Sequence, residues 1–592
     1  MQSAQIIRKT AAQGANGAVA AARLASAEAA QAMIDGGGNA VDAAVAAALV
    51  AGVVEPMETT LGGSGFMLIG TPDDGRVHSV EFGPRAPQRA RPDMYKIDTT
   101  RNIDRGLGIS VVMNDENVQG ITSAGVPATL RGLAAAHERF GLLPFAKVLG
   151  PAIDAAHNGF AADPYYALEA LANFDALRLD PGAVATYLTD GQVAAVPHLG
   201  TASLGAAPMI RQPVLGRTLE LIAAKGVDAF YDGELSAQLL TTVRELGGLL
   251  EAADLQSCRP VITEARRLRF RDVDVWAPNA PCGALTQLQM LQIWQSLYPE
   301  GAPIDETPER LQHLAEASWH AFADRYHWLG DTDFVPVPEQ ALLSSAYADK
   351  IAAAIRAGHP APRTHPGQAS PWNHFAGHAA HDPWPFQPDG PATPPTWAPR
   401  GATEPTAGTT HISVIDRNGM SVSMTHTAAN HFGAKVVCPR TGILFDAAMG
   451  WFNAMPNAAN SIAGGKRPLA NMGPMLLTRE GAPVAAIGAP GGRRIISAVV
   501  QIALNLVERG MDAEEAVNAP RIDASGSELL ASERLTATCR KSAAIAELLR
   551  PVDEQHAGFG YELARPIMAI RKPDGTVQAA ADPFSRGYAL GC

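Results

Sequence analysis

The feature that most constrains the fold is an abrupt change of sequence pattern about two thirds of the way along the 592-residue chain. From residue 125 to 357 the apolar spacing is mostly helical. Residues 358–405 are dense in Pro, His and Gly and have almost no periodicity, which predicts a long exposed connection. Beyond it, residues 411–415 and 420–425 alternate around an Asn418-Gly419 turn, which predicts a β-hairpin. The chain therefore reads as a helical part followed by a strand-rich part.

The N-terminal stretch predicts two helices and a strand. Residues 18–36 are Ala-rich with helical spacing and end at three consecutive glycines, which stop a helix. Asn39 can cap a second helix over 42–53, and residues 61–70 form a Gly-rich loop that runs into a strand. Further helices are expected over 130–140, 144–157, 239–246, 285–297, 308–327 and 494–508, a strand pair within 264–275, and strands over 475–478 and 484–487.

Charge and hydropathy exclude several classes of function. Lys and Arg number 47 and Asp and Glu 59, which gives a formal net charge of −12. A nucleic-acid partner is disfavoured because phosphate binding needs a basic face. A membrane span is not expected, because the most apolar run, residues 43–54, is shorter than the ~18 residues that a span requires. Residues 1–10 lack the apolar stretch of a secretory leader, so a cytoplasmic location is expected.

Cysteine and histidine spacing gives no sign of a metal site. The five cysteines are scattered and without CxxC spacing, so we expect unpaired, mostly buried thiols. The Pro-rich connection contains five histidines whose spacing matches no common ligand pattern. They are His359, His365, His374, His378 and His381. We expect no metal and no organic cofactor.

The sharpest chemical feature is Gly408-Thr409-Thr410-His411, where the Pro-rich connection meets the first strand of the hairpin. A threonine hydroxyl is a poor nucleophile and needs a base. If the chain is cut between Gly408 and Thr409, the new α-amino group, with an unperturbed pKa of ~7.7–8.0, can serve as that base. A threonine pair is also an ordinary choice at the start of a strand, so the pattern alone leaves a structural role open.

Motifs along nearly the whole chain resemble the γ-glutamyltranspeptidase (γ-glutamyltransferase) family. Two lie near the N-terminus, in residues 37–46 and 61–67, and others lie in the helical middle. The remainder follow the connection and include Thr409-Thr410-His411. The full set is residues 37–46, 61–67, 126–127, 314–317, 323–325, 329–331, 409–411, 418–419, 442–444 and 489–492.

This resemblance implies a fold, a cleavage and a set of roles. The fold would be α/β, the four-layer αββα sandwich of N-terminal-nucleophile hydrolases. The precursor would cut itself before Thr409, giving a large subunit (1–408) and a small subunit (409–592) that stay together. Thr409 would then attack an acyl carbonyl with its own amine as base, supported by Thr427. Gly491 and Gly492 would supply backbone N–H groups to the oxyanion, a role for which a Gly-Gly turn is physically suited.

The residues that would hold a γ-glutamyl group depart from the family pattern. The family's carboxylate-binding arginine aligns with Gly83, although Arg85 lies two residues on and can take an anion. The family's acidic residue is replaced by Trp451. Asn430 stands one step from an expected asparagine.

Two further family positions are also changed. The glutamine is replaced by Ala448, and a Ser-Ser pair by Ala470-Asn471. We therefore name Arg85, Asn430, Trp451 and Asn471 as candidate substrate contacts. Lost partners for a buried ammonium would each cost of order 1–3 kcal/mol, so we expect an acyl group without an α-amino group.

Three functional hypotheses follow. The first is a self-cleaving amidohydrolase with altered acyl specificity acting on a small-molecule amide. The second is an ordinary γ-glutamyltransferase or glutathione hydrolase, and the third is an uncut, non-catalytic relative. Hydrolysis and transfer pass through the same acyl-enzyme, so the sequence does not separate them. Homo-oligomer formation is left open.

Overall fold

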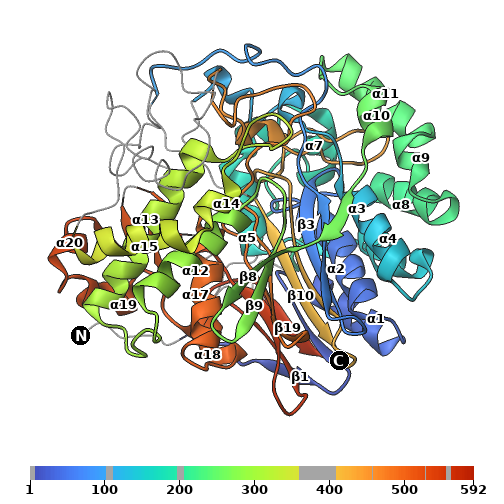
Figure 1. Ribbon diagram of the computed structural model, residues 1–592. Coiled ribbons are helices and arrows are strands. Elements are labelled where there is room, and N and C mark those ends of the chain that lie inside the picture. The colour runs from blue at the N-terminus through green and yellow to red at the C-terminus, as the bar shows by residue number, and fades with distance from the viewer. Residues whose placement is uncertain are drawn as a thin grey trace.

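The computed structural model describes residues 7–101, 111–196, 206–358, 408–456, 458–526, 528–554 and 562–592. The Pro-rich connection expected over 358–405 lies outside these residues except for Gly358, as do its five histidines. Two seven-stranded antiparallel sheets form the centre of the molecule (Figure 1).

The first sheet contains the strand that begins beside Thr409. Its order is β19 (Tyr588–Gly591), β2 (Gly17–Ala21), β10 (Thr410–Asp416), β11 (Ser421–Thr427), β3 (Ser64–Thr71), β4 (Arg76–Phe82) and β7 (Val261–Glu264). The predicted hairpin is its centre: Thr410 pairs with His426 and Ile415 with Ser421. The two strands thus lie between one strand from the N-terminus and one from the Gly-rich loop.

The second sheet has the order β1 (Ala12–Gly14), β18 (Val577–Ala581), β17 (Ile567–Arg571), β13 (Ala482–Gly488), β12 (Met475–Arg479), β9 (Val273–Ala277) and β8 (Arg266–Phe270). Two smaller sheets lie apart from it. One joins β14 (Ile522–Asp523), β15 (Leu529–Ser532) and β16 (Leu549–Val552), and the other β5 (Phe160–Ala161) and β6 (Met209–Ile210).

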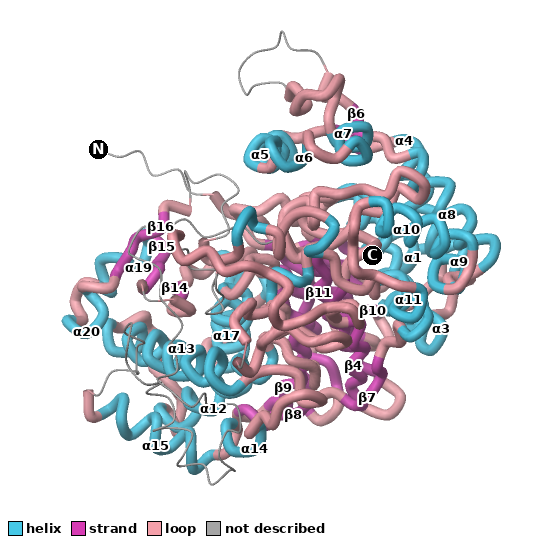
Figure 2. Tube along the Cα trace, turned by 90° about the horizontal axis from the view of Figure 1, so that it is seen from above, coloured by secondary structure: helices cyan, strands magenta, loops and turns pink. Residues whose placement is uncertain are grey.

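Three apolar layers hold the sheets and helices together. Small side chains of the facing strands, such as Ala20, Ala486 and Ala579, fill the space between the two large sheets. A second core lies under the helices that cover the first sheet, and a third under those that cover the second. Figures 1 and 2 show most of the helices in two groups on opposite sides of the strands. The predicted four-layer αββα sandwich is confirmed.

The helices divide by layer as follows. Over the first sheet lie α1 (Leu24–Asp35), α2 (Ala40–Val54), α3 (Thr129–Phe140), α4 (Phe145–Asn158), α8 (Pro213–Lys225), α9 (Asp228–Tyr231), α10 (Glu234–Glu245) and α11 (Ala252–Ser257). Over the second lie α12 (Ala284–Leu297), α13 (Pro308–Trp328), α17 (Arg494–Val507), α18 (Ala513–Asn518), α19 (Glu533–Cys539) and α20 (Ala543–Ala546). Smaller cores hold α5 (Pro164–Ala172), α6 (Phe174–Leu177), α7 (Pro181–Tyr187), α14 (Glu339–Leu342) and α15 (Ser345–Arg356).

Most elements predicted from the sequence are present, with one error near the N-terminus. Asn39 caps α2 as expected, its side chain accepting from the N–H groups of Val41 and Asp42. The prediction of a helix from residue 18 is wrong for Ala18–Ala21, which belong to β2. A run of alanines and one valine fits either structure, and here backbone pairing with β10 and β19 decides for a strand.

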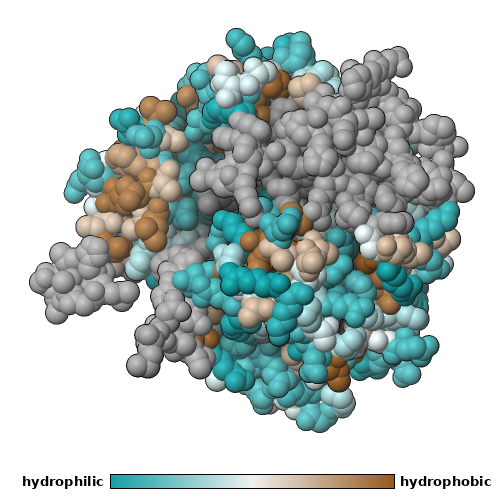
Figure 3. All heavy atoms as spheres, turned by 90° about the vertical axis from the view of Figure 1, so that its left-hand side faces the viewer, coloured by the Kyte–Doolittle hydropathy of each residue, from teal (hydrophilic) through white to brown (hydrophobic). Residues whose placement is uncertain are grey.

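The polarity of the surface and the state of the cysteines are as predicted from the sequence. The coloured part of the face in Figure 3 is mainly hydrophilic, with hydrophobic residues in small groups. No helix within the described ranges is both long enough and apolar enough to cross a membrane. All five cysteines are unpaired; Cys282, Cys438 and Cys539 are buried, and Cys258 and Cys592 are partly buried.

Candidate active site

Thr409 lies directly before β10 and is only 3% exposed. Ile412 and Val414 of β10 pack into the core beneath the helices. Because side chains alternate along a strand, Thr409 lies on the opposite face, toward the second sheet. Its hydroxyl oxygen is 3.3 Å from that of Thr427, the last residue of β11. The two threonines predicted to work together are therefore neighbours.

The carbonyl oxygen of Gly408 accepts a hydrogen bond from each of these hydroxyls. The Thr409 Oγ1–O distance is 2.7 Å, and the Thr427 Oγ1–O distance is 2.5 Å. Thr427 is itself held in place, because the N–H of Ala429 donates to its Oγ1 at 2.8 Å. The peptide bond before Thr409 is thus polarised by two donors, and the Thr409 hydroxyl lies beside the carbonyl of that bond.

Gly408 stands where no side chain fits. A methyl group at this position would collide with the carbonyl oxygen of Met57 and lie 3.0 Å from that of Asn430. Both obstacles are backbone atoms, which cannot move aside cheaply. The glycine before Thr409 is therefore required by the space around the bond.

A buried carboxyl contacts the other side of the same bond. The N–H of Thr409 donates to Glu58 Oε2 at 2.7 Å. The hydroxyl of Tyr165, from α5, donates to the second carboxyl oxygen. Burial raises the pKa of Glu58 to about 8, although the hydrogen bonds from Tyr165 and Thr409 pull it down. Glu58 thus holds a proton over much of the neutral pH range.

Gly491 and Gly492 follow β13, at the end of the strand that faces the start of β10. Ser423 of β11 donates to the carbonyl of Ile487 at 2.8 Å, which joins the two sheets there. Gly491 has φ +138° and Gly492 φ +60°, and a side chain at Gly491 would meet the backbone of Ala564 at 2.6 Å. Among the described residues, neither N–H donates a hydrogen bond to the protein.

A cavity of about 380 Å³ lies beside Glu58. Its lining includes Glu58, Tyr165 and Pro490, the residue before Gly491. Glu58, which contacts Thr409 N, and the residue that leads into the Gly-Gly turn therefore border the same space. The geometry brings the predicted oxyanion donors to the end of the sheet where Thr409 lies.

The four candidate substrate contacts are not gathered around Thr409 in one group. Asn430 lies beside Gly408 through its backbone, while its side-chain amide donates to Val118 O at 3.4 Å. The side-chain oxygen of Asn471 accepts from Arg325 at 3.0 Å and so holds a buried guanidinium. Asn471 is therefore already engaged in the fold.

Trp451 ends the short 3-10 helix η4 (Ala448–Trp451) and is 8% exposed. It belongs to one apolar cluster that also contains Ala429, Ala448 and Ala470. These are the positions at which the family's polar recognition residues are replaced. Ala429 is two residues from Thr427, and its N–H bonds the Thr427 hydroxyl, so the cluster reaches the nucleophile.

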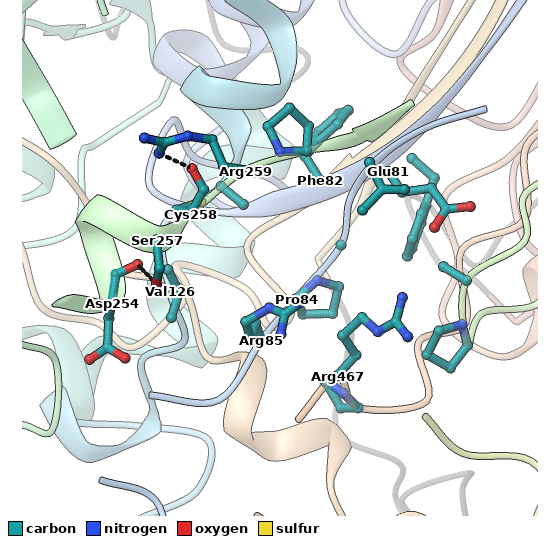
Figure 4. Close-up of a pocket in the computed structure, with 18 of the residues that line it drawn as sticks. Glu81, Phe82, Pro84, Arg85, Val126, Asp254, Ser257, Cys258, Arg259 and Arg467 are labelled. Carbon is teal, nitrogen blue, oxygen red and sulfur yellow. Dashed lines mark hydrogen bonds between the residues drawn. The ribbon is translucent and has the colours of Figure 1, made fainter. Parts of the chain in front are cut away.

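Arg85 lines a second cavity of about 730 Å³, which opens to solvent. Arg259, Arg467 and Glu81 also line it, and Figure 4 shows Arg85 and Arg467 along one side with Arg259 and Glu81 across from them. Arg467 is paired with Asp331 at 2.5 Å. Arg85 donates to Gly465 O at 2.7 Å and forms no ion pair among the described residues.

This larger cavity does not itself contain the chemistry. Its lining includes Gly83 but, like that of the smaller cavity, neither threonine and neither residue of the Gly-Gly turn. It opens next to Phe82, the last residue of β4, whereas Thr409 adjoins β10 of the same sheet. We therefore assign it no step of bond breaking.

Sequence reasoning missed Glu58 and Tyr165. Glu58 stands in the segment Glu55-Pro56-Met57-Glu58, directly before the Gly-rich loop. Two acids in an otherwise apolar stretch were a usable signal, because carboxylates are rarely buried without a partner. Nothing in the sequence linked Tyr165 to Thr409, 244 positions later. In the parts of the chain that the structure describes, no group of three potential ligands could hold a metal ion.

Comparison with known proteins shows which family the chain belongs to. The model of the family described as Gamma-glutamyltranspeptidase matches residues 26–592. The Acylase ACY 1 proenzyme of Pseudomonas sp. (strain V22) is 34% identical over 560 residues, 94% of this chain and 90% of that one. The Glutathione hydrolase proenzyme of Pseudomonas aeruginosa is 32% identical over 593 residues, 97% and 94% of the two chains.

Solved structures agree on the fold. The cephalosporin acylase from Bacillus halodurans superimposes with a TM-score of 0.80 at 22% identity, covering 100% of this chain and 99% of that one. At that identity the likeness concerns architecture alone. The match of the family model over almost the whole length, together with relatives above 30% identity, identifies the chain as a member of the gamma-glutamyltranspeptidase family.

Proposed function

We propose that this protein is a precursor that cuts itself between Gly408 and Thr409 and then hydrolyses a small-molecule amide through an acyl ester on Thr409. The resulting chains would be residues 1–408 and 409–592. The observation that carries the proposal is the Thr409 hydroxyl, buried beside the Thr427 hydroxyl, with both donating to the Gly408 carbonyl. The relatives named as proenzymes support a processed precursor.

We assign a group to each chemical step. After the cut, the amine of Thr409 takes the proton of its own hydroxyl, which attacks the substrate carbonyl. The N–H groups of Gly491 and Gly492 stabilise the oxyanion, a contribution worth ~2.7–4 kcal/mol where one donor has been removed. The substrate's C–N bond then breaks, the leaving amine takes the proton, and water hydrolyses the ester.

The acyl group is the part that departs from γ-glutamyl substrates. Ala429, Ala448, Trp451 and Ala470 pack as one apolar cluster. An α-ammonium placed there would lose its hydration without gaining a partner. We infer an acyl group that has no α-amino group and is flat or aromatic, so that it can pack against the Trp451 side chain. The similarity to a relative named an acylase over 94% of the chain fits this reading, and the similar likeness to a glutathione hydrolase keeps ordinary γ-glutamyl hydrolysis as the alternative.

Arg85 would bind a carboxylate only on an acyl group long enough to reach from Thr409 into the larger cavity. Its guanidinium has one hydrogen bond to a backbone carbonyl, which leaves other N–H groups for an anion at the cavity wall. Asn430 is proposed only as a backbone contact beside Gly408. Asn471 is proposed to shape the pocket by holding Arg325 rather than to touch the substrate.

The test is a pair of measurements on one preparation. p-Nitroanilides of acetic, benzoic, phenylacetic and glutaric acids are compared with γ-glutamyl-p-nitroanilide, and the acylated N-terminal peptide is sought by mass spectrometry after acid quench. We expect an acyl group on Thr409 and faster release from at least one anilide without an α-amino group. Preferred turnover of the γ-glutamyl anilide would contradict the altered specificity while leaving the nucleophile in place.

A further inference from the structure

We propose that Glu58 is the acid that protonates the nitrogen of Thr409 during self-cleavage and afterwards holds the new amine beside its hydroxyl. The inference rests on the proposed function, because it concerns the same bond. It deepens that function by assigning the proton that the departing nitrogen needs. No other described side chain hydrogen-bonds this nitrogen.

The geometry places the carboxyl on the leaving side of the bond. Glu58 Oε2 is 2.7 Å from Thr409 N, whereas the hydroxyls of Thr409 and Thr427 lie on the carbonyl oxygen of Gly408. The carbonyl is therefore activated from one side and the nitrogen from the other. An amide nitrogen leaves a tetrahedral intermediate only when it is protonated, and a neutral carboxyl within hydrogen-bond distance can supply that proton.

The carboxyl is held rigidly. Glu58 is 2% exposed, and Tyr165 donates to its Oε1. The backbone carbonyl oxygen of Glu58 accepts a hydrogen bond from the N–H of Ala428, next to Thr427. Side chain and backbone of Glu58 are thus both tied to the reacting group. A residue that only filled space would not need both attachments.

Burial, together with two neighbouring carboxyl groups, keeps the Glu58 carboxyl protonated near neutral pH. Glu55 from the end of α2 and Glu169 from α5 both oppose its ionisation, and burial opposes it most. Arg23, Arg565 and Arg586 line the adjoining cavity. Arg23 is paired with Asp163, and Arg565 lies 3.5 Å from Asp582.

The proton count of the step is closed. The bond from Thr409 Oγ1 to the Gly408 carbon forms, the carbon–nitrogen bond breaks, and the nitrogen takes the proton of Glu58. The hydroxyl proton of Thr409 passes to solvent water, and the ionised Glu58 regains a proton from solvent. Water then hydrolyses the ester, leaving the Gly408 carboxylate and the free Thr409 hydroxyl, and the proton released with the carboxylate is taken up by the new amine of Thr409. The net reaction consumes one water molecule and no other reagent.

The sign of the pH dependence follows. The protonated carboxyl is the active form, so cleavage is fast below the pKa of Glu58, about 8, and slows by about tenfold per pH unit above it. Removing the Tyr165 hydroxyl takes away a bond that favours the ionised form. Tyr165→Phe therefore raises the pKa of Glu58 and moves the decline to higher pH.

The test follows the cut directly and needs no substrate. The full chain is made in a short cell-free synthesis, which is stopped and diluted into buffers from pH 6 to 10, and the cut fraction is followed on denaturing gels. Glu58→Gln should slow cleavage by ~10²–10⁴-fold and remove the decline above pH 8. Glu169→Gln is the matched control, a partly buried acid of the same site region without a bond to Thr409. It should be cut at the normal rate at pH 6 to 7, and its decline should move to lower pH because Glu169 no longer opposes the ionisation of Glu58.

The outcomes separate this inference from the proposed function. Cleavage of Glu58→Gln at the normal rate, or with the same decline above pH 8, would overturn the role of Glu58 while leaving Thr409 as the nucleophile. A wild-type chain that is never cut would overturn both. If Glu58→Gln does not fold, the Tyr165→Phe profile decides: a shift to higher pH supports the proton donor, and an unmoved profile contradicts it.

Discussion

The hydroxyl of Thr427 donates a hydrogen bond to the carbonyl oxygen of Gly408 at 2.5 Å, although the two residues are 19 positions apart. The β10–β11 hairpin creates this contact, because it pairs Thr410 with His426 and so brings the end of one strand to the start of the other. In the uncut chain, Thr427 is therefore positioned to stabilise the negative charge that develops on this oxygen during cleavage.

Thr427→Ala should slow self-cleavage by ~10²-fold, the range seen when one oxyanion donor is removed. Uncut precursor should accumulate and convert over hours, as followed by denaturing gel. Thr427→Ser keeps the hydroxyl and serves as the control, with a rate near that of the wild type. Normal cleavage of Thr427→Ala would show that the hydroxyl only supports the fold.

Gly408→Ala should also yield precursor, for a steric reason. The added methyl group would press on the carbonyl oxygen of Met57 and displace the bond from the Thr409 hydroxyl. A displacement of about 1 Å can cost about 10²-fold in rate. Gly150→Ala, in α4 with open space around it, is the control that should be cut normally. Equal cleavage of both variants would contradict the tight fit.

Trp451→Leu should widen the acyl preference. The smaller side chain opens space in the apolar cluster that includes Ala429. The kcat/KM for p-nitroanilides of larger acids should therefore rise at least several-fold relative to that for the p-nitroanilide of acetic acid. Trp294→Leu removes a buried indole from the same cluster on α12 and is the matched control. Both should lower stability by less than the ~3–5 kcal/mol of a Trp→Ala change, but only the first should change the order of substrates.

Acid stability should depend on Asp42. Burial pushes the pKa of this carboxyl up, but hydrogen bonds from His137 and the backbone N–H groups of Asn39, Leu142 and Leu143 lower it below 3.8 overall. Its stabilising contribution is therefore present above pH 3.8 and is lost as the pH falls further.

Asp42→Asn, made in a Thr409→Ala background so that every sample is one chain, tests this dependence. The variant should be less stable by ~1–3 kcal/mol at pH 6, and the difference should shrink below pH 3.8. Thermal unfolding at several pH values measures it. A difference that stays constant down to pH 2 would show that lost packing, not the charge, is responsible.

The fold was predictable where local signals were strong. Asn39 marked the start of α2, and Asn418-Gly419 marked the turn of the central hairpin. β2 was mistaken for a helix because an alanine-rich run has no period of its own and its partner strand lies almost 400 residues away. The proximity of Thr409 and Thr427 was expected from motifs, but the contact of Glu58 was not, because its bond to Thr409 spans 351 positions.

The candidate substrate residues show the limit of motif comparison. Trp451 lies in an apolar cluster, the Asn471 side chain is engaged by Arg325, and Arg85 lies in a separate cavity. Sequence position indicates which residue replaces which, but the direction of a side chain depends on neighbours that come from distant segments. For that reason, the surroundings of these four residues could be described only from the structure.

The central claim is tested most directly by the intact mass of the purified protein, compared with that of Thr409→Ala. The uncut chain has a mass of 62.0 kDa. We predict two chains for the wild type, the smaller starting at Thr409 and running to Cys592, and one full-length chain for Thr409→Ala. A wild-type protein that stays at full length after prolonged incubation, or that is cut at another bond, would contradict the account.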